Sequence, residues 1–152
     1  MSIFPFKKAK DFFSDSEKEQ IVLAIQHAEK ETSGEVRVFV ESKNYLVDPL
    51  ERAREIFFNL KMDETAHRNA VLLYIAVKHK EVALFADQGI YQKLDNTYWN
   101  NAVAEMISYF KNEDLKNGMI HCIQKIGNTL KEKFPYDSTD KNELPDEIVF
   151  GK

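Results

Sequence analysis

The chain has 152 residues, of which 43% are hydrophobic and 30% charged, and this size is typical of one compact domain. A single cysteine, Cys122, and the lack of a Cys/His cluster with zinc spacing exclude disulfide scaffolds, zinc fingers and iron–sulfur proteins. A net charge of −4 provides no basic field for a polyphosphate backbone, so we expect no nucleic-acid partner. The longest apolar run, Ala70 to Val77, is too short to span a bilayer, and we expect a soluble, cytoplasmic chain.

Residues 1–13 form an N-terminal arm in which lysines interrupt four phenylalanines, at positions 4, 6, 12 and 13. This arrangement favours docking of the arm on the domain's own surface over insertion into a membrane. Ser14 and Glu17 then have the spacing of a capping box, which predicts a helix that continues to Lys30.

Two strand patterns and one helix pattern follow. Residues 35–41 alternate in polarity, which predicts a strand with valines on one face. Asp48 and Pro49 open a helix whose apolar stripe is Leu50, Ala53, Phe57 and Leu60. The continuously apolar residues 70–77 predict a central strand buried on both faces, and residues 82–86 follow closely enough to return as an antiparallel hairpin partner.

The second half of the chain is helical. One apolar stripe runs from Trp99 to Phe110 and another from Leu115 to Leu130, until Pro135 ends the last helix. Cys122 adjoins the second stripe and has no activating base, so we interpret it as a small core residue. The domain therefore covers residues 14–135, and residues 136–152 are expected to be a loosely held acidic tail.

These elements predict an α/β fold with a small mixed sheet. The strands at 35–41 and 70–77 form a β-α-β crossover, which is right-handed in almost all proteins, and the strand at 82–86 adds an antiparallel edge. This topology brings the start of the first two strands and the end of the third to one edge of the sheet. Polar residues gather there from separate loops: Glu35, Asp63, Glu64, His67, Arg68, Asn69 and Asp87.

Carboxylates and an amide oxygen are the ligands that Ca²⁺ or Mg²⁺ prefers, so we predict a divalent cation held by Glu35, Asp63, Glu64 and Asp87. Arg68 and Asn69 are the expected ligand-binding neighbours, because a guanidinium binds a phosphate oxygen or offsets carboxylate charge. A purely structural interpretation stays open for each residue. Asp87 is placed to cap a helix, and Arg68 and Asn69 are placed to close a loop through main-chain carbonyls.

Four segments resemble the TPM domain in order and spacing, and the resemblance covers roughly residues 12–135. They are residues 32–38, the Asp48–Pro49 helix start, residues 68–76 and residues 85–90. The family includes thylakoid-lumen proteins with reported phosphatase activity, and the resemblance implies a three-layer α/β/α sandwich with an acidic pocket that binds divalent ions in some members. This chain departs from the family in having Asn69-Ala70 where relatives usually have Asn-Gly. We also expect it to have none of the signal peptides, membrane helices or Gly-rich tails that many relatives carry.

Three functional hypotheses follow. The first is a Ca²⁺- or Mg²⁺-binding accessory or interaction module. The second is a metal-dependent phosphatase acting on phosphomonoesters, with Asp87 and Arg68 as its catalytic residues. The third is an assembly factor that binds a protein partner through the acidic edge or the Phe-rich arm.

Overall fold

The structure is a computed structural model of the chain and describes residues 8–44, 48–136 and 143–151. The prediction for Phe4 and Phe6 lies outside these residues. In chain order the elements are η1 (Ala9–Phe12), α1 (Asp15–Glu29), β1 (Glu35–Glu41), α2 (Pro49–Asn59), β2 (Ala70–Ala76), β3 (Glu81–Ala86), α3 (Gln88–Tyr91), α4 (Asn96–Lys111), α5 (Leu115–Lys133) and β4 (Val149–Phe150).

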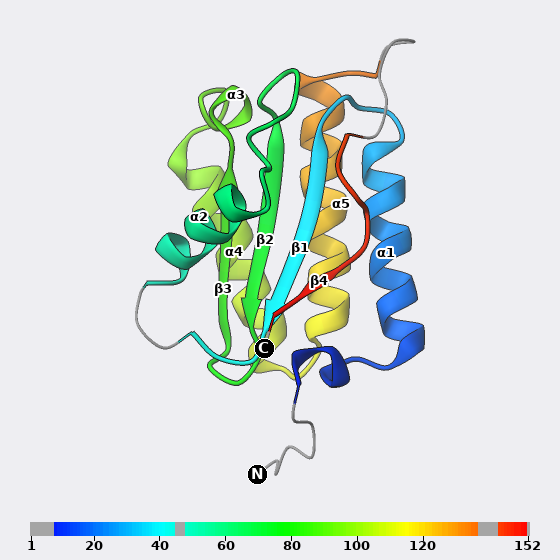
Figure 1. The fold of residues 1–152 in the computed structure, drawn as a ribbon, viewed down its shortest axis with the longest axis vertical. Helices are drawn as coiled ribbons and strands as arrows, with labels where there is room; N and C mark the ends of the chain where they lie inside the picture. Colours follow the sequence, from blue (N-terminus) through cyan, green and yellow to red (C-terminus); the bar gives the residue numbers. More distant parts are fainter. Residues whose placement is uncertain (1–7, 45–47, 137–142, 152) are drawn as a thin grey trace.

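The strands form one mixed sheet in the order β3-β2-β1-β4. β1 and β2 are parallel, with Glu35 opposite Ala70, and β3 returns antiparallel to β2. Helices α1, α4 and α5 cover one face of the sheet and α2 covers the other, so the molecule has three layers (Figure 1). The predicted α/β/α sandwich is therefore confirmed.

Local sequence signals account for the helix starts. Ser14 and Glu17 form the expected capping box, in which the Glu17 amide donates to Ser14 Oγ and the Ser14 amide donates to the Glu17 carboxylate. Asp48 Oδ1 accepts a hydrogen bond from the Leu50 amide at 3.2 Å, with Pro49 at the first helical position of α2. Leu50 itself is 48% exposed, and Ile56 joins Ala53 and Phe57 on the buried face instead.

The helical layer and the sheet enclose the larger of two cores, and α2 covers the smaller one around Phe57, Leu72 and Tyr74. Cys122 is a buried member of the larger core, where burial raises the pKa of its thiol to about 12. It is therefore a small apolar residue, as expected. None of the helices in the described part of the chain is both long and apolar enough to cross a membrane.

The C-terminal segment differs from the loosely held tail that the sequence predicts. β4 pairs in parallel with β1, placing Phe39 opposite Val149, and Leu144 is buried in the smaller core. The sequence pattern does not predict this packing, because Pro145 and two acids separate Leu144 from Val149. Residues 143–151 thus cover the β1 edge of the sheet (Figure 1).

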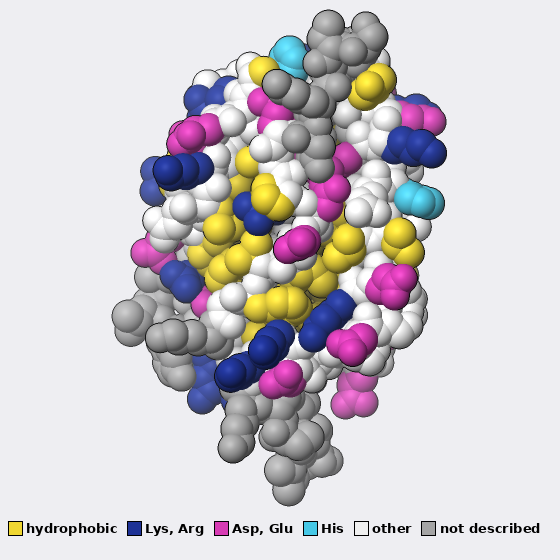
Figure 2. Space-filling model, turned by 45° about the vertical axis from the view of Figure 1, so that its right-hand side comes forward, with side chains coloured by type: hydrophobic (Ala, Val, Ile, Leu, Met, Phe, Trp, Pro, Cys, Tyr) yellow, Lys and Arg dark blue, Asp and Glu magenta, His cyan; other side chains and the backbone are white. Residues whose placement is uncertain are grey.

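The surface on this side of the molecule is mixed in character. Hydrophobic side chains lie in the middle of the face that includes α1 and the C-terminal segment, and charged side chains of both signs surround them (Figure 2). Ile148, Val149 and Phe150 are half-buried, with their apolar side chains packed against the two cores.

Candidate functional site

The polar residues predicted to meet at one sheet edge come from three adjacent strands. Glu35 begins β1, Asn69 precedes β2, and Asp87 follows β3. The Glu35 amide donates to the Asn69 carbonyl at 3.5 Å, and the Asp87 amide donates to the Ala70 carbonyl at 2.9 Å. Parallel pairing of β1 with β2 and the β2–β3 hairpin therefore bring them together, as the topology predicts.

Arg68 and Asp87 form a two-point ion pair at this edge. Arg68 Nε lies 2.6 Å from Asp87 Oδ2, and Nη2 lies 2.8 Å from Oδ1. The Asp87 side chain is 3% exposed and also accepts the Gln88 amide at 2.8 Å, so it caps α3. This bond to Asp87, assisted by the charge of Asp63, raises the pKa of the Arg68 guanidinium.

The main chain holds Arg68 in an unusual conformation. Its φ of 51° lies in the left-handed region, which a non-glycine residue seldom adopts. The Gly89 amide donates to the Arg68 carbonyl at 2.8 Å, and a Cβ at position 89 would lie 2.3 Å from the His67 carbonyl oxygen. Glycine at position 89 therefore allows α3 to pack directly on the loop that carries Arg68.

The C-terminal segment donates hydrogen bonds to the carboxylate of Glu35. Its two carboxylate oxygens accept the main-chain amides of Glu143 at 2.8 Å and Leu144 at 3.0 Å. Glu143 in turn accepts the Ala66 amide at 3.2 Å. Burial raises the pKa of Glu35 to about 7, although the two amides act in the opposite direction.

Two buried side-chain oxygen atoms in the loop before β2 have no hydrogen-bond partner in the described part of the chain. They are Asn69 Oδ1 and Thr65 Oγ1. The Asn69 amide nitrogen donates to Ser33 Oγ at 3.2 Å, which orients the side chain. Buried acceptors without donors are uncommon, and a bound water or ion is one way in which such a group is satisfied.

The remaining predicted residues are spread over the loop before β2. Asp63 is half-buried and acts electrostatically on Arg68, whereas Glu64 and His67 are exposed. Within residues 8–44, 48–136 and 143–151, no three His, Cys, Asp or Glu side chains are close enough together to hold a metal ion. The acidic residues therefore divide into a group with Arg68 and a group with Glu35.

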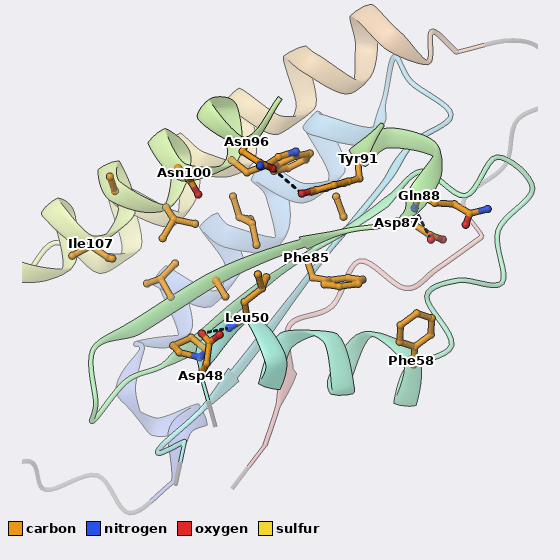
Figure 3. A pocket seen from close by; sticks show the side chains of 18 of the residues that line it. Asp48, Leu50, Phe58, Phe85, Asp87, Gln88, Tyr91, Asn96, Asn100 and Ile107 are labelled. Carbon is orange, nitrogen blue, oxygen red and sulfur yellow. Dashed lines mark hydrogen bonds between the residues drawn. The ribbon is translucent and has the colours of Figure 1, made fainter. Parts of the chain in front are cut away.

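A groove of about 780 Å³ runs along β3, with the Arg68–Asp87 pair at one end. Its floor is the whole of β3 after Glu81, one wall comes from α2 and the other from α4 (Figure 3). Apolar side chains predominate in the walls, among them Leu50, Phe58, Val103 and Ile107. Asn96 and Asn100 add amide groups along α4, and Asp48 lies at the end opposite Asp87 (Figure 3).

Trp99 lines the groove and carries a further unsatisfied group. Its indole Nε1 is buried and has no acceptor in the described part of the chain. Tyr91 stacks against the indole ring, with ring centroids 6.4 Å apart and planes inclined by 14°. Trp99 is the chain's only tryptophan, so the tryptophan fluorescence of the native chain comes from this groove residue alone.

Sequence reasoning missed the groove, although it predicted the polar edge. The sequence predicts one apolar stripe from Trp99 to Phe110, but Val103 and Ile107 within it are only half-buried and line the groove. The amides of Asn96 and Asn100, spaced one helical turn apart beside that stripe, were the available signal. The role of Glu143 as a partner of the Ala66 amide had no signal in the sequence.

Comparison with known proteins identifies the fold and the family. Residues 7–129 match the family model of the TPM domain, which is most of the chain. The chain belongs to the TPM domain family. No curated protein matches it.

Solved structures that resemble this chain share its fold. The NMR structure of the BA42 protein from the psychrophilic bacterium Bizionia argentinensis is 37% identical, with a TM-score of 0.85, covering 95% of this chain and 99% of BA42. The N-terminal domain of cg2496 from Corynebacterium glutamicum is 12% identical, with a TM-score of 0.64 and coverage of 95% and 90%. An N-terminal domain from P. gingivalis is 11% identical, with a TM-score of 0.66 and coverage of 80% and 78%. The last two share the fold.

Proposed function

We propose that this TPM-domain chain is a binding module whose ligand lies in the groove along β3. The observation that carries the proposal is the groove itself, an apolar cleft of about 780 Å³ formed by three separate elements. Ligand sites are usually concave and apolar, with a few polar groups that fix orientation. Here the buried Trp99 Nε1, the Asn96 and Asn100 amides and Arg68 are those polar groups.

The ion pair at the end of the groove favours binding over acid–base chemistry. Both Asp87 oxygens and two guanidinium nitrogens of Arg68 already bond to each other. A general base needs a free acceptor within reach of the proton that it removes. The pair is suited to hold the end of the groove in place and to offer the outer side of the half-exposed guanidinium to a ligand.

Trp99 fluorescence tests the proposal. The dye 8-anilinonaphthalene-1-sulfonate, an aromatic anion that binds apolar surfaces, should bind the native chain and quench Trp99 emission by energy transfer. Ala104 is an exposed groove residue, so Ala104→Trp places a ring in the cleft, and dye affinity should fall by about tenfold.

The matched control is Asn101→Trp, on the same helix and exposed but not part of the groove lining. Because each variant adds one tryptophan, dye emission rather than protein emission is compared between them. Equal dye affinity in the two variants, or no quenching of Trp99 in the native chain, would contradict the proposal.

A divalent-cation site is a second candidate function, supported by the two unpartnered side-chain oxygens in the loop before β2. Asn69 Oδ1 and Thr65 Oγ1 are neutral acceptors of the kind that Ca²⁺ takes together with carboxylates. A cation would compete with the proton on Glu35, whose pKa is about 7. Ca²⁺ or Mg²⁺ should therefore shift the amide resonances of residues 33–36 and 65–69 more strongly at pH 8 than at pH 6, and Glu35→Gln should abolish the shifts.

The phosphatase hypothesis extends this cation site. A bound cation would supply a Lewis acid, and Arg68 would counter the charge of a phosphoryl group. We expect Mg²⁺-dependent hydrolysis of p-nitrophenyl phosphate to disappear in Asp87→Asn if the hypothesis is right. Equal turnover by the native chain and the variant would reject Asp87 as its catalytic residue.

A further inference from the structure

The hydrogen-bonding pattern of β3 leaves alternate main-chain groups directed into the groove. The Asp87 amide donates to the Ala70 carbonyl, so residues 85, 83 and 81 are the ones that exchange hydrogen bonds with β2. In an antiparallel pair the intervening residues point their N–H and C=O groups the other way. Those residues are Val82, Leu84 and Ala86, and no hydrogen bond to their main-chain groups is found in the described part of the chain.

Strands β1 and β3, which lie on either side of β2, differ in whether another segment of the chain covers their outer edge. Residues 143–151 cover the β1 edge, where Val149 and Phe150 pair with β1 and the Gly151 amide donates to Val40 at 2.8 Å. At the β3 edge the described residues provide no such strand. β3 also lacks the proline, lysine or inward charge by which proteins usually block an open edge, since after Glu81 it reads Val-Ala-Leu-Phe-Ala.

The groove requires an occupant that is apolar at its sides and rich in main-chain donors and acceptors. An apolar small molecule would fill the walls but leave the N–H and C=O groups of Val82, Leu84 and Ala86 unpaired. An added strand meets both requirements, since its main chain pairs with β3 and its alternate side chains contact the two walls of the groove. β3 spans six residues, which matches a peptide of similar length.

We infer that β3 accepts an extended peptide segment of a partner protein, which adds as a fifth, antiparallel strand between α2 and α4. The inference rests on the proposed function and names the class of ligand. Antiparallel pairing is chosen because it is the more stable arrangement per residue.

The charges in the groove indicate which end of the peptide should carry a basic residue. Among the groove residues Arg68 and Asp87 neutralise each other, which leaves the carboxylate of Asp48 at the end where β3 begins (Figure 3). An antiparallel peptide has its C-terminal residues at that end, so a lysine or arginine belongs there. Side chains before it alternate between the α2 wall and the α4 wall.

The test uses a defined probe, the peptide acetyl-Thr-Val-Thr-Val-Thr-Lys-amide, added to the native chain. Amide hydrogen exchange along β3 is followed by NMR. Exchange at Val82, Leu84 and Ala86 should slow by about tenfold when the peptide is bound, because these N–H groups gain acceptors. Exchange at Ala83 and Phe85, which already bond to β2, should change little.

Two N-methylated peptides serve as matched probes. One is methylated at its first, third and fifth amides and the other at its second, fourth and sixth. An added strand directs only one of these sets at β3, so one peptide should lose about tenfold in affinity and the other should bind within about twofold of the parent. Equal affinity for the two would overturn the inference.

Protein variants and self-association complete the test. Ala104→Trp should lower the affinity of the chain for the parent peptide, and Asn101→Trp should leave this affinity unchanged. The alternative occupant of the groove is a second copy of the chain paired through β3. Sedimentation of the free chain would detect such a dimer, and this result would overturn the inference. If the dye quenches Trp99 but the peptide protects none of the three amides, the inference fails and the proposed function stands. If neither the dye nor the peptide binds, both fail.

Discussion

At the scale of single residues, the site depends on a close packing of main chain that only a few residue types allow. Arg68 occupies the left-handed region, and Gly89 lies against the carbonyls of residues 67 and 68. This close packing of the main chain holds Asp87 beside Arg68. The sequence predicted that these residues meet, but not that Arg68 and Asp87 satisfy each other, because side-chain pairing depends on loop geometry that has no sequence period.

Replacement of Gly89 tests this packing. In Gly89→Ala the new methyl carbon would lie 2.3 Å from the His67 oxygen and 2.5 Å from the Arg68 oxygen. Main-chain atoms cannot rotate away, so the free energy of unfolding should fall by about 2 kcal/mol, against the usual gain of alanine in a helix. Urea unfolding measures the loss. Gln88→Ala, its exposed neighbour, should change stability by less than about 0.5 kcal/mol.

The raised pKa of Glu35 predicts a pH dependence of stability. The folded chain holds this proton up to about pH 7, whereas the unfolded chain releases it near 4.5. The contribution of Glu35 is therefore fully present below pH 4.5 and is lost as the pH rises to about 7. Burial also raises the pKa of Glu29 to about 10, so the stability that Glu29 contributes continues to fall above pH 7.

Two glutamine variants separate these contributions in urea unfolding measured from pH 4 to 10. Glu35→Gln should reduce the slope of stability against pH below about pH 7 and leave the slope above it unchanged. Glu29→Gln should reduce the slope up to about pH 10. A native chain whose stability rises between pH 4.5 and 7 through Glu35 would contradict the assigned direction.

At the scale of elements, hydrophobic period and capping signals predicted the central strand, the hairpin and the main helices. They failed for β4, because two half-buried residues after an acidic, proline-containing segment produce no period. They also failed for β1, where Glu35, Arg37 and Glu41 are buried despite the alternating pattern. Partners such as Glu143 for the loop before β2, and Arg52 for Glu41, become visible only when distant segments meet.

Leu144 tests whether the C-terminal segment belongs to the fold. It is buried in the smaller core, so Leu144→Ala should lower the free energy of unfolding by about 2 to 3 kcal/mol. The exposed Glu147 provides the control, and Glu147→Ala should change stability by less than about 0.5 kcal/mol. A loosely held tail would instead make both substitutions neutral in thermal or urea unfolding.

At the scale of the whole molecule, one sheet edge is closed by the chain's own C-terminal segment and the other opens into an apolar groove. The family resemblance in the sequence, from residues 32–38 to residues 85–90, led to the correct fold and family. The predicted strand topology led to the polar edge but not to the groove, because the groove lies between α2 and α4, which are far apart in sequence. The binding function proposed here follows from that three-dimensional arrangement.

The most direct test of peptide binding at β3 is amide hydrogen exchange along this strand, measured by NMR on the free chain and on the chain with the hexapeptide. We expect alternation in the free chain, with fast exchange at Val82, Leu84 and Ala86 and slow exchange at Ala83 and Phe85. The peptide should abolish the alternation by protecting the first three. Uniform protection of β3 in the free chain, or alternation that persists at saturating peptide, would contradict these expectations.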